Sequence, residues 1–176
     1  INADYVSAIA KSLDLKLEWT SEVPIGQSVE ELRSGKIDAI CASEGPLMPS
    51  TTKFLSYSKA FAYFPFFFYA KDGDHRFDNN LNAANTKATR IALFDGDVSG
   101  AIVDSRFTKA TRHPLPQTAS PTQLYTDVAM GKADLMIDCD AGALPFQKAN
   151  PKSIRKVKME APLAVIPNTF SVLRGP

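Results

Sequence analysis

The sequence predicts an α/β protein made of two similar lobes, each an open sheet flanked by helices. Helical patterns alternate with short apolar runs along the 176 residues, an order typical of α/β folds with mainly parallel strands. Residues 35–43 are nearly repeated at residues 131–140: in both copies a helix ends at Gly-Lys, an Asp follows, and an apolar strand carries a cysteine. No apolar run approaches the roughly 18 residues that a membrane-spanning helix needs.

The first third of the chain is expected to contain two helix–strand pairs. Apolar residues recur with a period near 3.6 over residues 2–13, which predicts a helix, and alternate over residues 15–19, which predicts a half-buried strand. Ser28, with a glutamate three residues later, predicts the capped start of a second helix that ends at Gly35. A strand over residues 37–42 then leads into a polar loop.

The rest of the chain continues this alternation. The aromatic run over residues 63–70 predicts a strand that is buried on both faces or crosses between the lobes. Residues 90–94 form a predicted strand, and Ser120 followed by Pro121 marks a helix start that leads to a stop at Gly131. The other expected elements are a short helix or loop over 78–87, helices over 101–107 and 140–149, and strands over 112–117, after Gly131, over 154–158 and over 163–173.

Composition and motifs exclude several function classes. The formal net charge of +1 gives no reason to expect nucleic acid as a partner. His75 and His113 have no ligand at metal-binding spacing, and no phosphate-binding or nucleophile-elbow motif is present, so no metal, cofactor or catalytic residue is expected. Cys41 and Cys139 lie in apolar runs without a nearby histidine, which predicts two buried free thiols.

Acidic residues follow the predicted strands. In open α/β sheets, ligands bind outside the carboxyl ends of the strands, where several such acids together would form a binding edge. The simpler interpretation is that Asp97 and Asp140 cap helices and that the others are solvated. The acids at strand ends are Glu44, Asp95, Asp97, Asp138 and Asp140.

Four motifs, in order and spread over nearly the whole chain, match a known family. Residues 29–40 read VEELRSGKIDAI, similar to the pattern aLqsGkiDaii, and residues 54–61 read FLSYSKAF, similar to vdFSdPY. Residues 90–96 resemble kVgVqkG, and residues 130–134 resemble nGrvDa. On these motifs the chain resembles extracellular solute-binding proteins of family 3, the periplasmic amino-acid-binding type.

This resemblance implies a two-lobed type II periplasmic-binding-protein fold, the Venus flytrap, in which hinge strands join two open sheets. Lobe one would hold residues 1–66 plus 165–176 and lobe two residues 70–162, with hinge strands at about 64–69 and 165–170. The resemblance also implies a strand before Asn2 and a helix after Pro176. The implied protein is a monomer in the periplasm, or lipid-anchored outside the cell, that captures a small molecule for the membrane permease of an ABC importer.

The chain departs from the family where the ligand is held. The family's carboxylate-binding arginine falls near Thr51, and a Ser/Thr pair of lobe two falls on Asp97 and the next residue. The family's amine-binding acid falls on Cys139, between Asp138 and Asp140. An Asp facing a ligand carboxylate at 4 Å costs about 4 kcal/mol at an effective dielectric near 20. We therefore expect a cationic or neutral polar solute, amino-acid-like or an amine.

The expected ligand contacts come from both lobes, and the expected protein is not an enzyme. Three alternatives stay open: a ligand-sensing domain of a signalling protein, an enzyme similar to cyclohexadienyl dehydratases, which the missing arginine argues against, and the effector domain of a transcription regulator. The expected contacts are Ser43, Glu44 and Thr51 in lobe one and Asp97, Asp138 and Asp140 in lobe two.

Overall fold

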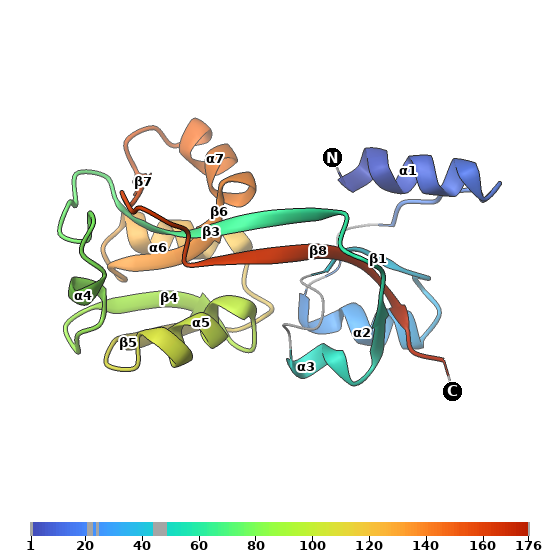
Figure 1. Ribbon diagram of the computed structural model, residues 1–176, viewed down its shortest axis with the longest axis horizontal. Coiled ribbons are helices and arrows are strands. Elements are labelled where there is room, and N and C mark those ends of the chain that lie inside the picture. Colours follow the sequence, from blue (N-terminus) through green and yellow to red (C-terminus); the bar gives the residue numbers. More distant parts are fainter. Residues whose placement is uncertain (1, 21–22, 24, 44–48, 176) are drawn as a thin grey trace. The chain divides into compact units, whose positions relative to one another are not determined.

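The chain folds into two compact units in the computed structural model (Figure 1). Unit 1 holds residues Ile1–Tyr63 and Pro167–Pro176, and unit 2 holds Phe64–Ile166. The structure describes residues 2–20, 23, 25–43 and 49–175. Within that part, no helix is both long and apolar enough to cross a membrane.

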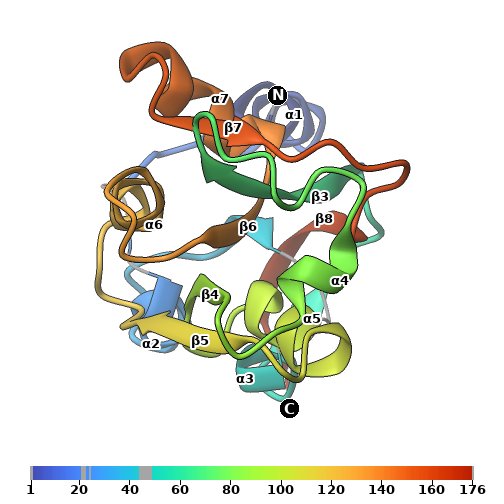
Figure 2. The same ribbon diagram turned by 90° about the vertical axis from the view of Figure 1, so that its left-hand side faces the viewer.

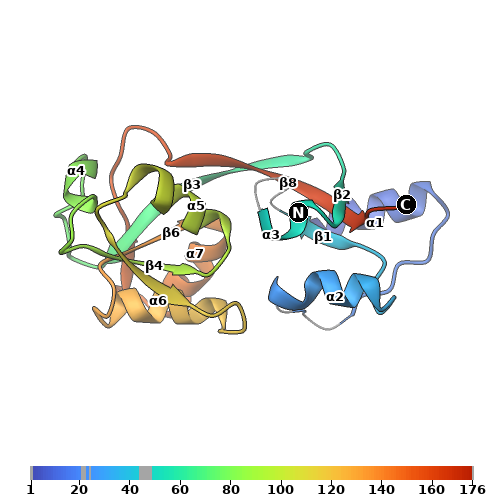
Figure 3. The same ribbon diagram turned by 90° about the horizontal axis from the view of Figure 1, so that it is seen from below.

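Unit 1 is built on the strand β8 (Ala164–Leu173). The short strands β1 (Ile40–Ser43) and β2 (Leu55–Tyr57) both pair antiparallel with β8, as Figure 3 allows the reader to follow. The other elements of this unit are α1 (Asn2–Ser12), the 3-10 turn η1 (Ile25–Gln27), α2 (Ser28–Arg33) and α3 (Pro49–Thr52).

Two predictions for unit 1 are wrong. Residues 15–19 are irregular, and Leu15 and Trp19 are 62% and 57% exposed, because the alternating pattern has no partner strand among the described residues. Ser28 is the first residue of α2 rather than its cap, and Gln27 stands at the cap position without a side-chain hydrogen bond. The predicted stop at Gly35 is confirmed, since this glycine has a φ of +71° that favours residues without a Cβ.

Unit 2 is a five-stranded sheet with helices on both faces (Figure 2). The strand order is β3-β6-β4-β5, and β7 pairs with β3. Its elements are β3 (Ala62–Lys71), α4 (Leu81–Ala84), β4 (Arg90–Phe94), α5 (Val98–Arg106), β5 (Thr111–Leu115), α6 (Pro121–Ala129), β6 (Leu135–Cys139), α7 (Asp140–Ala149) and β7 (Ile154–Lys156). The boundaries between the two units fall inside β3 and β8.

The prediction of a mainly parallel sheet is correct only for part of unit 2. The strand β4 is parallel to β5 and β6, whereas β3 is antiparallel to β6 and β7. Both sheet pairings of unit 1 are also antiparallel. Composition could not reveal these directions, because a strand buried on both faces is an apolar run whichever way its neighbours point.

The core of unit 2 has two apolar layers, one on each face of the sheet. Successive residues of β4 point to opposite faces of the sheet and so pack alternately into the two layers. Ile91 and Leu93 pack with α4 and α5, whereas Ala92 and Phe94 pack with α6 and α7. The sheet of unit 2 is therefore covered by apolar packing on both sides.

Local signals at both ends of α6 are confirmed. The Ser120 hydroxyl accepts a hydrogen bond from the Thr122 N–H at 3.3 Å, Pro121 is the first helical residue, and Gly131 follows the helix with a φ of +74°. Next along the chain, Asp134 accepts a 2.9 Å hydrogen bond from the Arg90 N–H and a 3.0 Å bond from Arg76. Asp134 thereby fastens the amino ends of β4 and β6 together, so it is structural.

Candidate functional site

Parallel pairing brings the carboxyl ends of β4 and β6 to the same edge of unit 2. Ile91 lies opposite Leu135 and Ala92 opposite Met136, so both strands end on this side of the sheet. The helices α5 and α7 begin directly after them. We call this region the carboxylate edge and define it by Asp97, Asp138 and Asp140, the three predicted contacts of lobe two.

Asp97 is the cap of α5. Its Oδ1 accepts hydrogen bonds from the Gly100 N–H at 2.9 Å and from the Ser99 hydroxyl at 2.6 Å. Gly96, with a φ of +76°, makes the preceding turn possible. Burial raises the pKa of the Asp97 carboxyl, although these hydrogen bonds oppose the effect. The simpler interpretation of Asp97 as a cap therefore holds, and the same side chain is also a partly buried acid at the strand end.

Asp138 lies under the first turn of α7. Its carboxylate accepts hydrogen bonds from the Tyr125 hydroxyl of α6 and from the Cys139 N–H, the latter at 2.6 Å. Burial raises the pKa of Asp138, and the negative charge of Asp97 also raises it, although the hydrogen bonds from Tyr125 and the Cys139 N–H oppose the effect. A Cβ on Gly142 would lie only 2.6 Å from Asp138 Oδ2 and 2.7 Å from the Tyr125 hydroxyl, so the helix backbone closes directly over this pair.

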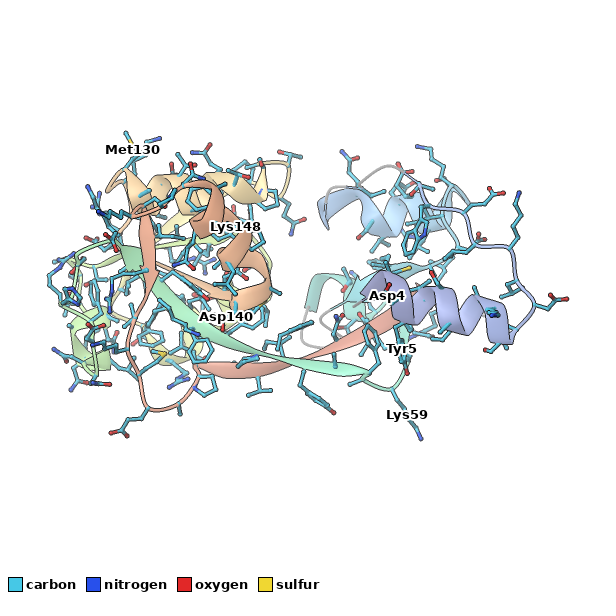
Figure 4. The ribbon with its side chains drawn as sticks, turned by 90° about the horizontal axis from the view of Figure 1, so that it is seen from above. Asp4, Tyr5, Lys59, Met130, Asp140 and Lys148 are labelled. Carbon is cyan, nitrogen blue, oxygen red and sulfur yellow. The ribbon has the colours of Figure 1, made fainter. Side chains whose placement is uncertain are left out.

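Asp140, the first residue of α7, is already paired. Both of its oxygens lie 2.8 Å from Lys156 Nζ, and Oδ1 also accepts a 2.6 Å hydrogen bond from the Tyr69 hydroxyl. Lys156 and then Tyr69 lower the pKa of Asp140. Figure 4 labels Asp140 at the start of α7, with Lys148 further along the same helix.

The remaining residues near this edge have other roles. Cys139 is a free thiol whose pKa is raised by burial and by the charge of Asp138. Asp95 is exposed, and its closest basic partner, Arg112, lies 3.9 Å away and bonds instead to Asp104 at 2.7 Å. Cys41 is also a free thiol. Both cysteines are half-buried rather than buried as predicted; Cys41 is the second residue of β1, and Cys139 is the last residue of β6.

The predicted contacts of lobe one belong to unit 1. Ser43 is the last residue of β1, and Thr51 in α3 is half-buried, with its Oγ1 3.2 Å from the Tyr57 hydroxyl. Glu44 lies outside the described residues. Of the six predicted contacts, the structure thus brings Asp97, Asp138 and Asp140 together at one edge of unit 2.

Sequence reasoning missed the three side chains that hold this edge. Tyr125 lies on the buried side of α6. A buried tyrosine usually needs a hydrogen-bond partner for its hydroxyl, so this position could have suggested a polar contact. Tyr69 and Lys156 both contact Asp140 because β3 pairs with β7 in a register that places Tyr69 opposite Lys156. No sequence pattern indicated that register.

The carboxylate edge suits hydrogen-bond donors and positive charge. Helix N-termini ordinarily attract anions. Here the first N–H groups of α5 already bond to Asp97, and those at the start of α7 face Asp138 and the Cys139 thiol. Among the described residues, only Asp140 of the three acids has a basic partner in an ion pair. The edge therefore has carboxylate oxygens to offer and a net negative charge.

Comparisons with known proteins agree on the architecture. No protein-family model matches the sequence, and no curated protein matches it. The periplasmic VFT2 domain of Bordetella pertussis BvgS superposes with a TM-score of 0.82 at 17% identity, covering 99% of this chain and 71% of that one. The chain has the Venus flytrap fold.

Two further structures with the Venus flytrap fold are similar to the chain. AbpA from Streptococcus pneumoniae, an amino-acid ABC transporter substrate-binding protein bound to L-arginine, gives a TM-score of 0.77 at 16% identity over 98% of this chain and 70% of that one. An ancestral amino-acid-binding protein, a precursor of cyclohexadienyl dehydratase, gives a TM-score of 0.76 at 20% identity, covering 99% of this chain and 71% of that one. The resemblance in the four sequence motifs is thus confirmed at the level of fold.

Proposed function

We propose that the chain is a solute-binding domain that captures a small polar solute, cationic or neutral, for the permease of an ABC importer. The observation that carries this proposal is the carboxylate edge, because it offers acceptors to a ligand in a fold shared with amino-acid-binding proteins. Asp97 and Asp138 accept donors from the ligand, and Ser43, Glu44 and Thr51 are the proposed contacts of unit 1.

The ligand class follows from electrostatics. A ligand carboxylate placed 4 Å from Asp97 or Asp138 would be repelled by about 4 kcal/mol at an effective dielectric near 20. An ammonium, guanidinium or amide in the same place would donate to those oxygens. Charge-assisted hydrogen bonds of this kind contribute roughly 1.5–3 kcal/mol each.

Units 1 and 2 are the two lobes, and β3 and β8, which carry residues of both units, are the hinge strands. The domain works as a monomer in the periplasm or on the outer face of the cell membrane. Substrate-binding proteins of ABC transporters among the similar structures support this assignment.

Mass spectrometry under non-denaturing conditions tests the proposal. The purified chain is measured as isolated and after incubation with millimolar amines, cationic amino acids, polar neutral solutes and dicarboxylates. We expect an added mass for at least one cationic or neutral solute and none for the dicarboxylates. Retention of dicarboxylates alone, or of no solute at all, would contradict the proposed function.

A ligand-sensing domain of a signalling protein is the second candidate. The TM-score of 0.82 with the VFT2 domain of BvgS favours it, since that structure aligns with 99% of this chain. The full-length gene distinguishes the two candidates. A downstream kinase or cyclase domain would support the sensor, whereas a secretion signal followed by this domain alone would support the importer.

We also propose that the chain has no enzymatic activity. The ancestral precursor of cyclohexadienyl dehydratase shares the fold, but a dehydratase of cyclohexadienyl acids must bind a carboxylate, and Thr51 stands near the position of the family's carboxylate-binding arginine. We expect no turnover when the chain is incubated with a cyclohexadienyl acid. A product peak in chromatography would overturn this expectation.

A further inference from the structure

The partly exposed ammonium of Lys156 lies between the Asp140 carboxylate and the Phe67 ring. Its Nζ is 2.8 Å from both carboxylate oxygens of Asp140 and 4.5 Å from the centre of the Phe67 ring. The Tyr69 hydroxyl donates to Asp140 Oδ1 at 2.6 Å and fixes the orientation of that carboxylate. A carboxylate on one side and an aromatic face on the other are the two groups that recognise an organic ammonium.

Two elements, β3 and α7, hold the other groups of this site in place independently of Lys156. Tyr69 and Phe67 lie on the long strand β3, and the Tyr69 side chain is fully buried. Asp140 begins α7, where the helix dipole favours its negative charge. Only Lys156 reaches the site through a flexible side chain, from the last position of the short strand β7. The walls of the site therefore remain when the lysine ammonium leaves.

We propose that Phe67, Tyr69 and Asp140 form an ammonium-binding subsite that Lys156 occupies as a tethered internal ligand. The inference rests on the proposed function and deepens it, because Asp140 then contacts a cationic solute only when that solute displaces Lys156. Lys156 is thus a specificity-determining residue of the carboxylate edge.

Tethering explains what the lysine achieves. A group held by a short link has an effective concentration at its site of about a millimolar or more. A free amine that makes no other contact cannot compete with it at lower concentrations. A solute with further donors for Asp97 and Asp138 gains additional binding energy and can displace the lysine. The tethered Lys156 therefore excludes simple amines from the subsite and admits larger cationic solutes.

Replacing the lysine tests the subsite with a probe that needs no natural ligand. Ethylammonium chloride is titrated into the full chain by NMR, at ionic strength matched with sodium chloride, because salt alone screens exposed charges. We expect saturable shifts of the Tyr69 and Asp140 amides in Lys156→Ala. In Lys156→Ala/Asp140→Asn we expect affinity at least about tenfold weaker, a difference that corresponds to the loss of one charge-assisted contact.

The control for this titration is a substitution of another lysine near the subsite. Lys158→Ala removes an exposed lysine two residues away, whose described hydrogen bonds are made by its main-chain N–H and C=O, and should behave like the unmodified chain. A folded Lys156→Ala variant that binds no ethylammonium would overturn the proposal. So would equal binding by Lys156→Ala and the double variant, or binding by the unmodified chain as tight as by Lys156→Ala.

A second measurement covers the case in which the variant does not fold. Acetic anhydride modifies exposed lysines of the unmodified chain, and peptide mass spectrometry gives the rate at each site. We expect Lys156 to react several-fold more slowly than Lys158, and equal rates would overturn the proposal. The failure of these tests is distinct from a failure of solute binding, because neither involves the solute.

Discussion

Asp97 has two opposing effects on stability, because it caps α5 and also carries a partly buried charge. Asparagine caps a helix as well as aspartate does but has no charge, whereas alanine cannot cap. We expect Asp97→Ala to lose about 1 kcal/mol of unfolding free energy and Asp97→Asn to lose none at neutral pH. Urea denaturation of both variants measures this. Equal losses in the two variants would contradict the assignment of Asp97 as a cap.

The pKa of Asp97 sets the pH dependence of that comparison. Burial raises it in the folded state, so the stabilising effect of its protonated form is complete below the unfolded value of about 3.9 and is lost as the pH rises through the folded value. The unmodified chain should therefore lose stability relative to Asp97→Asn as the pH rises above about 4. An unchanging difference over that range would show that the charge is solvated.

The pKa of Asp78 is shifted in the opposite direction to that of Asp97. Asp78 accepts bonds from Arg155 at 2.7 and 2.9 Å and from the Lys158 N–H at 2.9 Å, and its side chain is 16% exposed. Although burial opposes the effect, His75, Lys158 and Arg155 together lower the pKa of Asp78. Asp78→Asn leaves Arg155, which is 14% exposed, without its charged partner.

We expect Asp78→Asn to cost roughly 2 kcal/mol of unfolding free energy at pH 7. The contribution of a carboxylate with a lowered pKa is present above the unfolded value and is lost as the pH falls through the folded value. The difference between the two proteins should therefore shrink below about pH 4. Chemical denaturation at pH 7 and pH 3 measures it, and a difference that grows on acidification would refute this account.

At the scale of elements, α5 and α7 offer a matched pair of glycines. Gly100 and Gly142 each occupy the third position of a helix, where alanine ordinarily gains about 1 kcal/mol over glycine. A Cβ on Gly100 would have no neighbour closer than 3.4 Å, whereas one on Gly142 would lie 2.6 Å from Asp138. The same substitution therefore has opposite expected effects in the two helices.

We expect Gly142→Ala to lose roughly 1–2 kcal/mol, because overpacking costs more than helix propensity returns. Gly100→Ala should be neutral or stabilising by up to about 1 kcal/mol. Thermal or urea unfolding of the two variants gives the sign directly. If Gly142→Ala is as stable as Gly100→Ala, the backbone of α7 does not close over the Tyr125–Asp138 pair as described.

Elements with strong local signals could be predicted from the sequence. The predicted bounds of β4 and α7 agree with the structure, and the Ser120 cap of α6 is present, because period and capping chemistry are local properties. The strand expected over residues 15–19 failed because a strand needs a partner, and the direction of β3 could not be predicted because composition carries no direction. Non-local pairing accounts for each of these failures.

The same division applies to the carboxylate edge. Asp97, Asp138 and Asp140 could be placed at one edge from the rule that ligands bind outside the carboxyl ends of parallel strands. The hydrogen-bond and ion-pair partners of Asp138 and Asp140 could not be predicted, because Tyr69, Tyr125 and Lys156 come from elsewhere in the chain.

We propose that the whole molecule, with its Venus flytrap fold, binds a solute that donates hydrogen bonds or carries positive charge. The fold is shared with proteins that bind amino acids. What separates this chain from the family pattern is the acidic character of the edge in unit 2. The ligand's charge is therefore the property that distinguishes the proposal from ordinary amino-acid capture through a carboxylate clamp.

Isothermal titration calorimetry measures the ligand's charge preference. Amines, cationic amino acids, polar neutral solutes and dicarboxylates are titrated into the unmodified chain and into Asp138→Asn. We expect saturable binding of at least one cationic or neutral solute at millimolar concentration or below, and no binding of dicarboxylates. If the bound solute is a cation, its affinity should be about tenfold weaker in Asp138→Asn. Absence of binding by every solute up to millimolar concentration, or tightest binding by a dicarboxylate, would contradict the proposal.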